Sequence, residues 1–562
     1  MAGLAFFLLY PIGLTVAGGF AADPARGLTL RPESWTLVHI RLALSDPVIR
    51  DALRNSFLIA TATTCTAIVI ALPLATLSAC YRFPGKKIFN ALILVPLILP
   101  PFVGAIGVRA LLGREGALNA LFGTEFDILG QGKFLGVVAV QSLSLYPIIF
   151  LNAAASLANL DPALNESAEN LGAGPVRRFF KITLPLIRPG LFAGGTIIFI
   201  WSFTELGTPL MFDFYRVTPV QIFYGLKEIE SSAEPYALTV ILLTCAITFY
   251  ILGRTVFGRK GHAMYSKAAR AADERPLPPI VAALASGLFA LVCSLALLPH
   301  VGVIFTSLSG VGAWYDSVLP TSYTLHHFAE ALGAPEAFGA IRNSLFLSLS
   351  AMMLDIVLGI LIAYIVVRTK LVGRHLLDTL CMLPLAVPGL VLAFGFVAMT
   401  LRWPFGKGGP LEGVFAVLGA DPNPFPLLVF AYAVRRLPYI VRAASAGLEQ
   451  TSGELEEAAI NLGASRIMAV RRVIVPLIAA NLIAGGLLVF SFSMLEVSDS
   501  MILAQKTSHF PITKMIFEYM NRLGDGPYIA SAMGVWGMVL LTVTLFGASL
   551  MLGKKLGSIF RV

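Results

Sequence analysis

Two acidic residues occupy matching places at the ends of apolar stretches in the sequence. Glu205 stands three residues before Thr208, and Glu496 stands three residues before Asp499. Burying an unpaired carboxylate in a membrane is costly, so acidic groups inside membrane segments often line a substrate path. The alternative interpretation is that these residues cap helix ends or face interfacial water. Both interpretations stay open from the sequence, and the four side chains are candidates for a translocation pathway.

No other group of residues has the pattern of a catalytic or metal site. The five cysteines lie in or beside apolar stretches and lack metal-ligand spacing. His326 and His327 are adjacent but have no further ligands nearby in the sequence, so we expect them to face solvent. Gly406-Lys407-Gly408-Gly409 lacks the spacing of a phosphate-binding loop and is expected to form a turn. We therefore predict no catalytic residue, no metal site and no cofactor, and we expect the chain not to be an enzyme.

The elements that must position these side chains are membrane helices. Of the 562 residues, 57% are hydrophobic and 13% are charged, whereas soluble domains have roughly 45–50% and about 25%. Apolar runs of about 20 residues match the bilayer core, and they must be helices because backbone polar groups have no partner in lipid. The sequence predicts an all-α polytopic membrane protein with about twelve transmembrane helices. The predicted spans are residues 2–20, 52–80, 88–112, 134–158, 188–212, 236–257, 278–307, 343–367, 376–401, 424–445, 480–504 and 529–552.

Positive charge is distributed unevenly between the two sides of the membrane. Assigning loops alternately to the two sides places 25 of the 41 Lys and Arg on one side, which includes residues 254–275 and 435–472. The positive-inside rule makes that side cytoplasmic. The net charge of +9 is therefore explained by topology, and we expect no nucleic-acid partner. Residues 2–20 lack the basic start of a signal peptide and are expected to be a retained helix.

The sequence is internally duplicated. At an offset of 288, Asn55 matches Asn343, Pro96 matches Pro384 and Pro100 matches Pro388; at an offset of 291, Gly172 matches Gly463, Pro185 matches Pro476 and Glu205 matches Glu496. Six helices per half is an even number, so both halves have the same orientation and form parallel repeats. We predict a first half over residues 1–257, a basic cytoplasmic linker over 258–277 and a second half over 278–562.

The two halves share a polar loop between their fourth and fifth helices, which we call the first loop (residues 161–189) and the second loop (residues 452–478). In the first loop, Asp161 is a predicted helix N-cap, Pro162 suits the first helical position and Gly172 suits the position past the helix end. In the second loop, Ser452 is the predicted cap and Gly463 the terminating glycine. The pattern predicts a short helix, a glycine turn and a basic helical segment that enters the membrane.

These loops resemble the EAA motif of binding-protein-dependent ABC importer permeases. The first loop has Glu166-Ser167-Ala168, Gly172 and Ile182-x-Leu184-Pro185, and the second has Glu457-Ala458-Ala459, Gly463 and Ile474-Val475-Pro476. The departures are Ser167 in the first triplet and Val475 before the second proline. The resemblance implies that each loop is a coupling helix that docks in a cleft of the ATPase. The residues that it assigns to ATPase coupling are Glu166, Ala168, Gly172, Pro185, Glu457, Ala458, Ala459, Gly463 and Pro476.

The same resemblance implies the fold and the partners. It implies the type I ABC importer permease fold in a bacterial inner membrane, two copies of a separate cytoplasmic ABC ATPase and a periplasmic solute-binding protein. The overall pattern is most similar to the ferric-iron permease group: two fused EAA halves of this length, with Ser202-Phe203-Thr204-Glu205-Leu206-Gly207-Thr208 in the first half. Related permeases carry thiamine, 2-aminoethylphosphonate, polyamines or sulfate, and these cargoes stay open. A two-half, twelve-helix secondary transporter is the alternative class, but it does not explain the paired loops.

Overall fold

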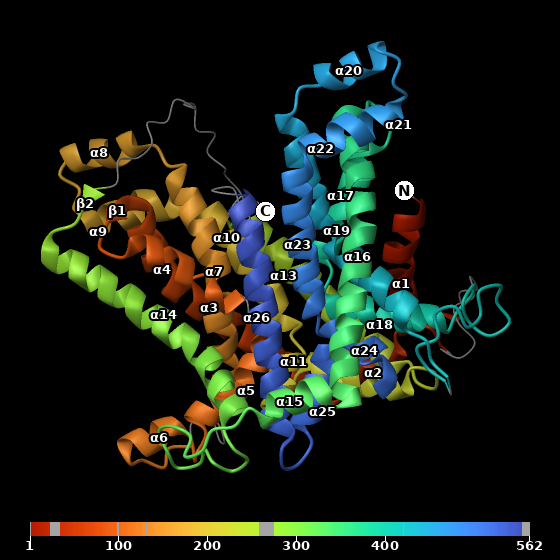
Figure 1. Cartoon of the computed structure of the whole chain (residues 1–562), viewed down its shortest axis with the longest axis horizontal. Helices are drawn as coiled ribbons and strands as arrows, with labels where there is room; N and C mark the ends of the chain where they lie inside the picture. The colour runs from red at the N-terminus through yellow and green to blue at the C-terminus, as the bar shows by residue number, and fades with distance from the viewer. Residues whose placement is uncertain are drawn as a thin grey trace. The chain divides into compact units, whose positions relative to one another are not determined.

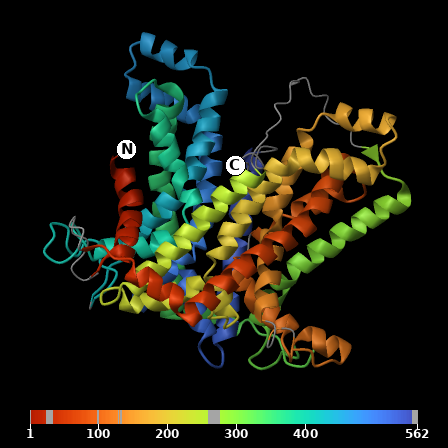
Figure 2. The same ribbon diagram turned by 180° about the vertical axis from the view of Figure 1, so that it is seen from behind.

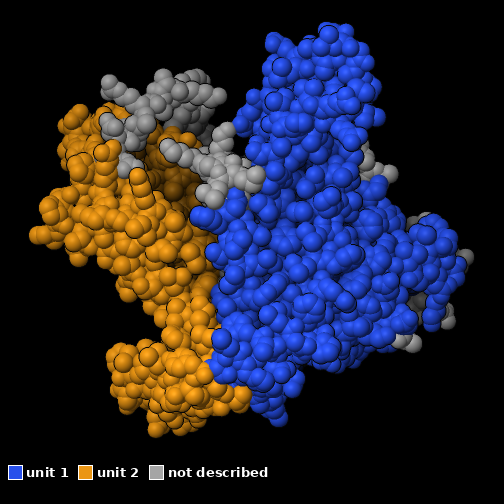
Figure 3. Space-filling model, in the orientation of Figure 1, with its two compact units in different colours: residues 1–50, 218–243, 324–559 blue, residues 51–217, 244–323, 560–562 orange. Residues whose placement is uncertain are grey.

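The computed structural model describes residues 2–22, 34–97, 100–127, 129, 133–257, 275–419 and 421–552. The chain divides into two compact units, coloured separately in Figure 3. Unit 1 comprises Met1–Arg50, Thr218–Leu243 and Thr324–Ile559, and unit 2 comprises Asp51–Val217, Thr244–Tyr323 and Phe560–Val562. Each unit therefore combines stretches from both predicted halves. Of the predicted linker, residues 258–274 lie outside the described part of the chain.

Unit 2 is built mostly on helices of the first half and includes α14 of the second half (Figure 1). Its long helices are α3 (Pro47–Cys80), α5 (Pro101–Leu112), α7 (Lys133–Ala158), α10 (Leu184–Phe203), the second part of α13 (Glu234–Phe257) and α14 (Pro279–Leu308). Its short helices are α4 (Lys86–Leu92), η2 (Val95–Leu97), α6 (Ala117–Phe122), α8 (Pro162–Asn170), α9 (Pro175–Arg178), η3 (Phe179–Thr183) and α11 (Gly207–Met211). Two short strands, β1 (Tyr81–Arg82) and β2 (Arg275–Pro276), pair in parallel.

Unit 1 is built mostly on helices of the second half and includes the first helix of the first half. Its long helices are α1 (Ala2–Phe20), the first part of α13, α16 (Pro335–Arg368), α17 (Arg374–Ala386), α18 (Gly389–Thr400), α19 (Phe425–Gln450), α23 (Ala479–Met494) and α26 (Gly526–Leu552). Its short helices are α2 (Val38–Ser45), α12 (Thr218–Gly225), η4 (Leu226–Glu228), α15 (His326–Gly333), α20 (Glu454–Asn461), α21 (Arg466–Ala469), η5 (Val470–Ile474), α22 (Val475–Leu477), α24 (Ser498–Leu503), η6 (Thr507–His509) and α25 (Ile512–Met520).

The helices agree with the predicted membrane spans in all but one place. Within the described ranges, eight helices are long and apolar enough to cross a membrane, and three bent pairs raise the number to eleven. The bent pairs are Lys86–Leu97 with Pro101–Phe122 at 101°, Arg374–Ala386 with Gly389–Thr400 at 105°, and Arg466–Leu477 with Ala479–Met494 at 77°. The remaining predicted span, 424–445, is helical as α19, but it is absent from these apolar candidates and carries Arg435, Arg436 and Arg442.

The duplication is visible as one contact made twice. In unit 1, a Cβ on Gly395 of α18 would lie 2.6 Å from the carbonyl oxygen of Pro11 in α1. In unit 2, a Cβ on Gly107 of α5 would lie 2.1 Å from the carbonyl oxygen of Pro299 in α14. Only glycine permits such a close backbone approach. The first helix of each half thus packs on a helix of the other half: α1 packs on α18, and α14 packs on α5 (Figures 1 and 2).

A second pair of equivalent contacts involves the N-terminal parts of α3 and α16. Asn55 donates a side-chain hydrogen bond to the carbonyl oxygen of Arg216 at 2.9 Å. Its counterpart Asn343 donates to the carbonyl oxygens of Ser508 at 3.0 Å and Phe510 at 3.2 Å. Each asparagine therefore holds the segment that leads into its half's last span.

Small residues let the helices of unit 2 pack closely. Ala67, Ala71 and Ala75 recur every fourth residue along α3 and are fully buried. This spacing places them in one row on a single face of the helix. They belong to a core that also contains Tyr146 of α7 and Phe289 of α14. A packed helical scaffold of this kind positions the first loop.

Candidate functional site

The short helix of the first loop, α8, begins and ends where the sequence predicts. Asp161 is the N-cap of α8, and its Oδ1 accepts a hydrogen bond from the amide of Ala163 at 3.0 Å. After the helix, Gly172 has a φ of 80°, a left-handed conformation that costs other residues energy. The amide of Gly172 donates to Glu169 O and that of Ala173 donates to Ala168 O, both at 2.9 Å. These two bonds form a Schellman motif, which ends the helix sharply.

The second loop has the same backbone with a different start. Gly453, rather than the predicted Ser452, is the N-cap of α20, although Ser452 Oγ still accepts from the amide of Glu454 at 3.2 Å. A serine one residue before the cap can still satisfy a free amide of the first turn. At the other end Gly463 has a φ of 92°, and the amide of Ala464 donates to Ala459 O at 3.0 Å. The short helices α8 and α20 therefore end in the same Schellman turn.

Each loop contains a π-helical turn at an equivalent position, after its short helix and glycine turn. The turns are η3 (Phe179–Thr183) and η5 (Val470–Ile474). Pro185 and Pro476 come two residues after them. A proline cannot donate to the carbonyl four residues earlier and clashes with it, so the preceding turn widens. The two prolines thus explain why the helix leaving each loop changes its winding before it continues.

Each loop carries exposed apolar side chains beside its small residues. Leu171 and Leu462, at equivalent positions, are 88% and 90% exposed. Val176 and its counterpart Ile467 are exposed as well. Glu166, Glu457 and Ala458 are also on the surface, and Ala168 and Ala459 are half-buried under the turn. An exposed apolar patch with a polar rim is typical of a protein-binding surface.

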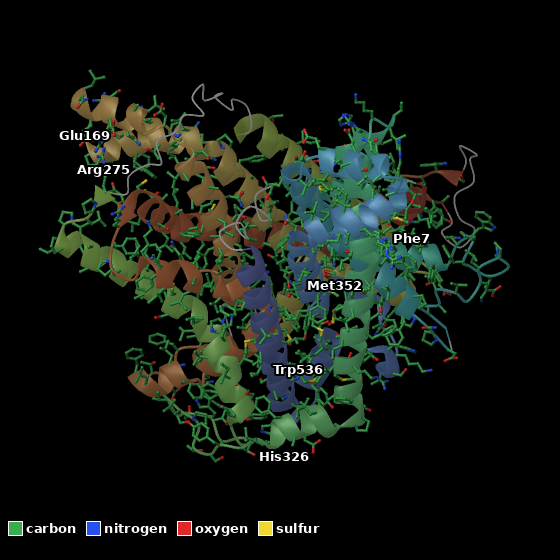
Figure 4. The ribbon with its side chains drawn as sticks, turned by 45° about the horizontal axis from the view of Figure 1, so that its top comes forward. Phe7, Glu169, Arg275, His326, Met352 and Trp536 are labelled. Atoms are coloured by element: carbon green, nitrogen blue, oxygen red, sulfur yellow. The ribbon has the colours of Figure 1, made fainter. Side chains whose placement is uncertain are left out.

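The first loop is held by an arginine from the end of the linker. Glu169 Oε2 accepts from Arg178 and from Arg275 Nη1, the latter at 3.1 Å, and Arg275 Nη2 lies 3.9 Å from Glu166 Oε1. Arg275 itself pairs with Tyr81 through the β1–β2 ladder. Figure 4 shows Glu169 and Arg275 together. Hydrogen bonds from Arg178 and then Arg275 lower the pKa of Glu169.

The second loop is held by residues of α16. Tyr364 donates a hydrogen bond to Glu456 of α20, which is buried. Arg368 Nη2 donates to the carbonyl oxygens of Leu448 at 3.0 Å and Thr451 at 2.7 Å. The aligned positions in the first half are Thr76 for Tyr364 and Cys80 for Arg368. The two loops thus share a backbone but are anchored by different side chains.

The first candidate pathway acid lies at a break between two helices of unit 2. Helix α10 ends at Phe203, Glu205 follows, and α11 begins at Gly207. Glu205 Oε1 accepts from the amide of Thr208 at 3.3 Å and from its hydroxyl at 3.4 Å. Glu205 lies one residue before the N-cap Leu206, and its carboxylate satisfies a free amide in the first turn of α11. Glu205 and Thr208 are therefore brought together by the break, and Thr208 is buried.

The second candidate acid lies at the equivalent break of unit 1 and has charged partners. Glu496 binds Arg435 and Arg436, one on each carboxylate oxygen. Arg435 Nη1 also lies 3.1 Å from Asp499 Oδ2. The side chains of Glu496 and Asp499 are only 5% and 2% exposed. Glu496 and Asp499 are brought together by two arginines of α19, as buried charges require partners.

These arginines overturn part of the predicted charge distribution. The sequence interpretation placed Arg435 and Arg436 in a cytoplasmic loop over 435–472, whereas both lie within α19 and are largely buried. The α-helix runs on through Pro438 to Gln450. A pair of arginines inside an apolar span signals acidic partners, so the sequence held a clue to this cluster.

Another buried carboxylate was missed by sequence reasoning. Asp355 of α16 is fully buried, and within the described part of the chain neither of its oxygens has a hydrogen-bond partner. Asp499 Oδ1 and Arg436 Nε are also buried without a hydrogen-bond partner among the described residues. Unsatisfied buried polar atoms call for an explanation such as bound water, a proton or an ion. The signal in the sequence is a single aspartate in an apolar run.

The adjacent histidines His326 and His327 have different surroundings. His326 is exposed and lies 3.8 Å from Glu330, but His327 is buried and stacks on Tyr528, so the prediction that both face solvent is wrong for His327. Its aromatic ring fills a contact between α15 and α26 that the sequence pattern does not reveal. Over the residues that the structure describes, no group of three His, Cys, Asp or Glu is arranged to hold a metal.

Comparison with known proteins gives a consistent family. The family model described as binding-protein-dependent transport system inner membrane component matches residues 51–262 and again residues 355–550. The ferric transport system permease protein FbpB of Actinobacillus pleuropneumoniae is 28% identical over 96% of this chain and 76% of its own length. A putative ferric transport permease of Haemophilus influenzae is 26% identical over 92% of this chain and 78% of its own length.

A shorter relative matches less than half of the chain. The probable molybdenum ABC transporter permease of Haloferax volcanii is 30% identical over 42% of this chain and 81% of its own length. The part of this chain that it matches is thus similar to most of a complete permease. Relatives of different length therefore agree on the type of protein and differ in the cargo that their names give.

Proposed function

Because the chain belongs to the family of binding-protein-dependent transport system inner membrane components, we propose that it imports ferric iron as the permease of an ATP-driven transporter. Its family and its apolar helices make it a multi-pass protein of the inner membrane. The two family matches correspond to two fused permease halves. The observation that carries the proposal is the pair of equivalent loops, each with a left-handed glycine and an exposed leucine.

In the proposed mechanism each loop docks in one copy of a separate ATPase. Leu171 and Leu462 insert into the ATPase, and Glu166 and Glu457 make polar contacts at the rim. Ala168 and Ala459 supply the carbonyl oxygens that accept in the Schellman turns. Gly172 and Gly463 adopt the left-handed conformation that these turns require. Pro185, Pro476 and Ala458 complete the surface. When the ATPase subunits approach each other, the movement reaches α10 and α23 through the π-helical turns.

The cargo is proposed from the relatives. Two relatives that cover most of this chain carry ferric transport in their names. Glu496 and Asp499 are ion-paired with arginine, so the choice of cargo rests on the relatives and not on these acids. A periplasmic binding protein delivers the cation in this proposal. Thiamine, 2-aminoethylphosphonate, polyamines and sulfate are the competing cargoes.

The docking surface is tested by binding of the purified ATPase. We expect Leu171→Asp and Leu462→Asp each to weaken ATPase binding about tenfold, because a central apolar contact carries much of an interface's affinity. Leu121→Asp is the matched control, since Leu121 is an exposed leucine of α6 outside both loops. Unchanged affinity in both loop variants would show that the ATPase docks elsewhere.

The cargo is tested in proteoliposomes that contain the permease, the ATPase and the binding protein. We expect ATP-dependent uptake of radioactive ferric iron, which stops when the binding protein is omitted. Uptake of one of the competing cargoes instead would replace iron in the proposal and leave the permease assignment intact. Uptake that persists without the ATPase and follows a proton gradient would favour a secondary transporter.

A further inference from the structure

We infer that Arg435 is a positioning residue that holds the carboxylates of Glu496 and Asp499 at the break between α23 and α24. It binds both carboxylates, and its guanidinium is largely buried. The inference deepens the proposed function, because it assigns a role to a residue beside the candidate pathway acids. It does not depend on which cargo is carried.

The place of the guanidinium is set by a missing side chain. Gly389 is the first residue of α18, directly after the 105° bend between α17 and α18. A Cβ on Gly389 would lie 0.9 Å from Arg435 Nη2 and 2.1 Å from its Cζ. Glycine is therefore the only residue at this position that leaves the guanidinium its site. Arg435 consequently lies between two helix breaks, one before α18 and one before α24.

The electrostatics of this place require the two carboxylates. A cation beside the first residue of a helix is unfavourable, because the helix N-terminus carries partial positive charge. Two nearby carboxylates compensate this effect and the cost of removing the guanidinium from water. Conversely, Asp499 Oδ2 has Arg435 as its charged partner at 3.1 Å. The arginine and the acids therefore fix one another across the two breaks.

The first half supplies a comparison within the same chain. Helix α5 begins at Pro101 after Pro100, just as α18 begins at Gly389 after Pro388. The position equivalent to Arg435 is Ser144. The half with a short side chain at this position thus has a proline at the helix start, and the half with arginine has glycine. This paired exchange is what a steric requirement of the guanidinium predicts.

The inference is tested with Gly389→Ala, Arg435→Ser and the double variant in the complete transporter. The first readout is the amount of cargo carried per ATP hydrolysed in proteoliposomes. We expect each single variant to lower this ratio about tenfold, because displaced pathway groups lose their working geometry. The double variant should transport no worse than Arg435→Ser, since the alanine methyl then enters vacated space. Gly339→Ala in α16 is the control, because a Cβ there meets nothing within 4 Å.

Two further measurements keep the inference testable if a single variant is unstable. The melting temperature of the purified permease should show the same non-additive pattern, and this measurement needs no cargo. Arg435→Lys should recover the transport ratio only in part, to within about threefold of the wild type, since an ammonium keeps the positive charge beside the carboxylates but lacks the planar guanidinium. A wild-type ratio in Gly389→Ala, or full additivity of the two substitutions, would overturn the inference. A ratio that follows melting temperature alone in every variant, Arg435→Lys included, would make Arg435 merely structural.

Discussion

The break after α10 and the break after α23 occupy equivalent places in the two halves, but different interactions stabilise them. Glu205 accepts hydrogen bonds from Thr208 three residues ahead, so the first break is satisfied locally. Glu496 binds two arginines about sixty residues away in the sequence, so the second break depends on the packing of α19. Duplication has preserved the backbone and the acid, whereas the surrounding side chains have diverged.

The difference teaches that one backbone feature can have two functional meanings. In the first half, Glu205 accepts hydrogen bonds from the amide and the hydroxyl of Thr208 in the helix that follows the break. In the second half, a buried cluster with charges of both signs lies beside the break. We therefore expect the second half to contribute most of the electrostatic character of the pathway. The following predictions test this asymmetry and the parallel asymmetry of the two loops.

The largest expected effect is the loss of one carboxylate from the buried cluster. Glu496→Gln should destabilise the purified permease by about 3–5 kcal/mol, because it leaves buried arginine charge uncompensated. The matched variant Glu205→Gln should cost less than about 1 kcal/mol, because the glutamine oxygen can still accept the hydrogen bonds from Thr208. Thermal unfolding in detergent measures both. Equal losses in the two variants would show that the breaks are not held differently.

The next effect concerns the anchor of the second loop. Tyr364→Phe removes the donor to buried Glu456 and should cost about 1–3 kcal/mol, the range for an unsatisfied buried group. The variant should also weaken ATPase binding through the second loop. Thr76→Val at the aligned position of the first half is the control, and it should leave the first loop's binding unchanged. ATPase affinity of the two variants decides the outcome.

The loop glycines should behave alike, because their conformations match. Gly172→Ala and Gly463→Ala should each cost about 1–2 kcal/mol, since each forces a side chain into the left-handed region. We expect both to lower the coupled ATPase rate by similar factors. A large effect at one glycine and none at the other would break the equivalence of the two loops.

The smallest expected effect is a pH dependence of the first loop's anchor. The folded-state pKa of Glu169 is lowered by Arg178 and Arg275, so the contact is fully present above the unfolded-state pKa. It is lost as the pH falls through the lowered folded-state pKa. Hydrogen-exchange protection of α8 should then fall by less than about twofold, because exposed ion pairs contribute little. Glu169→Gln should abolish the pH dependence, and an unchanged dependence would assign it to other groups.

The paired loops show how far the sequence reaches. Asp161, Gly172 and Gly463 act within a few residues of their own backbone, so their roles as cap and turn follow from local chemistry. The duplication fixed where the equivalent turns, prolines and acids must occur. Apolar length predicted nearly all of the membrane helices. The shift of the second cap to Gly453 is a one-residue difference of the kind expected at helix ends.

The charged cluster shows what the sequence left undecided. Arg435 and Arg436 looked like loop residues because local composition does not reveal which acids face them. Only the packing of α19 against α23 and α24 brings them to Glu496 and Asp499, and only Gly389 leaves the space that Arg435 fills. By itself the sequence determined a duplicated membrane permease with two equivalent loops, because those features depend on short-range spacing. The partners of the buried charges were decided by the tertiary structure, because contacts between distant helices depend on shape and space.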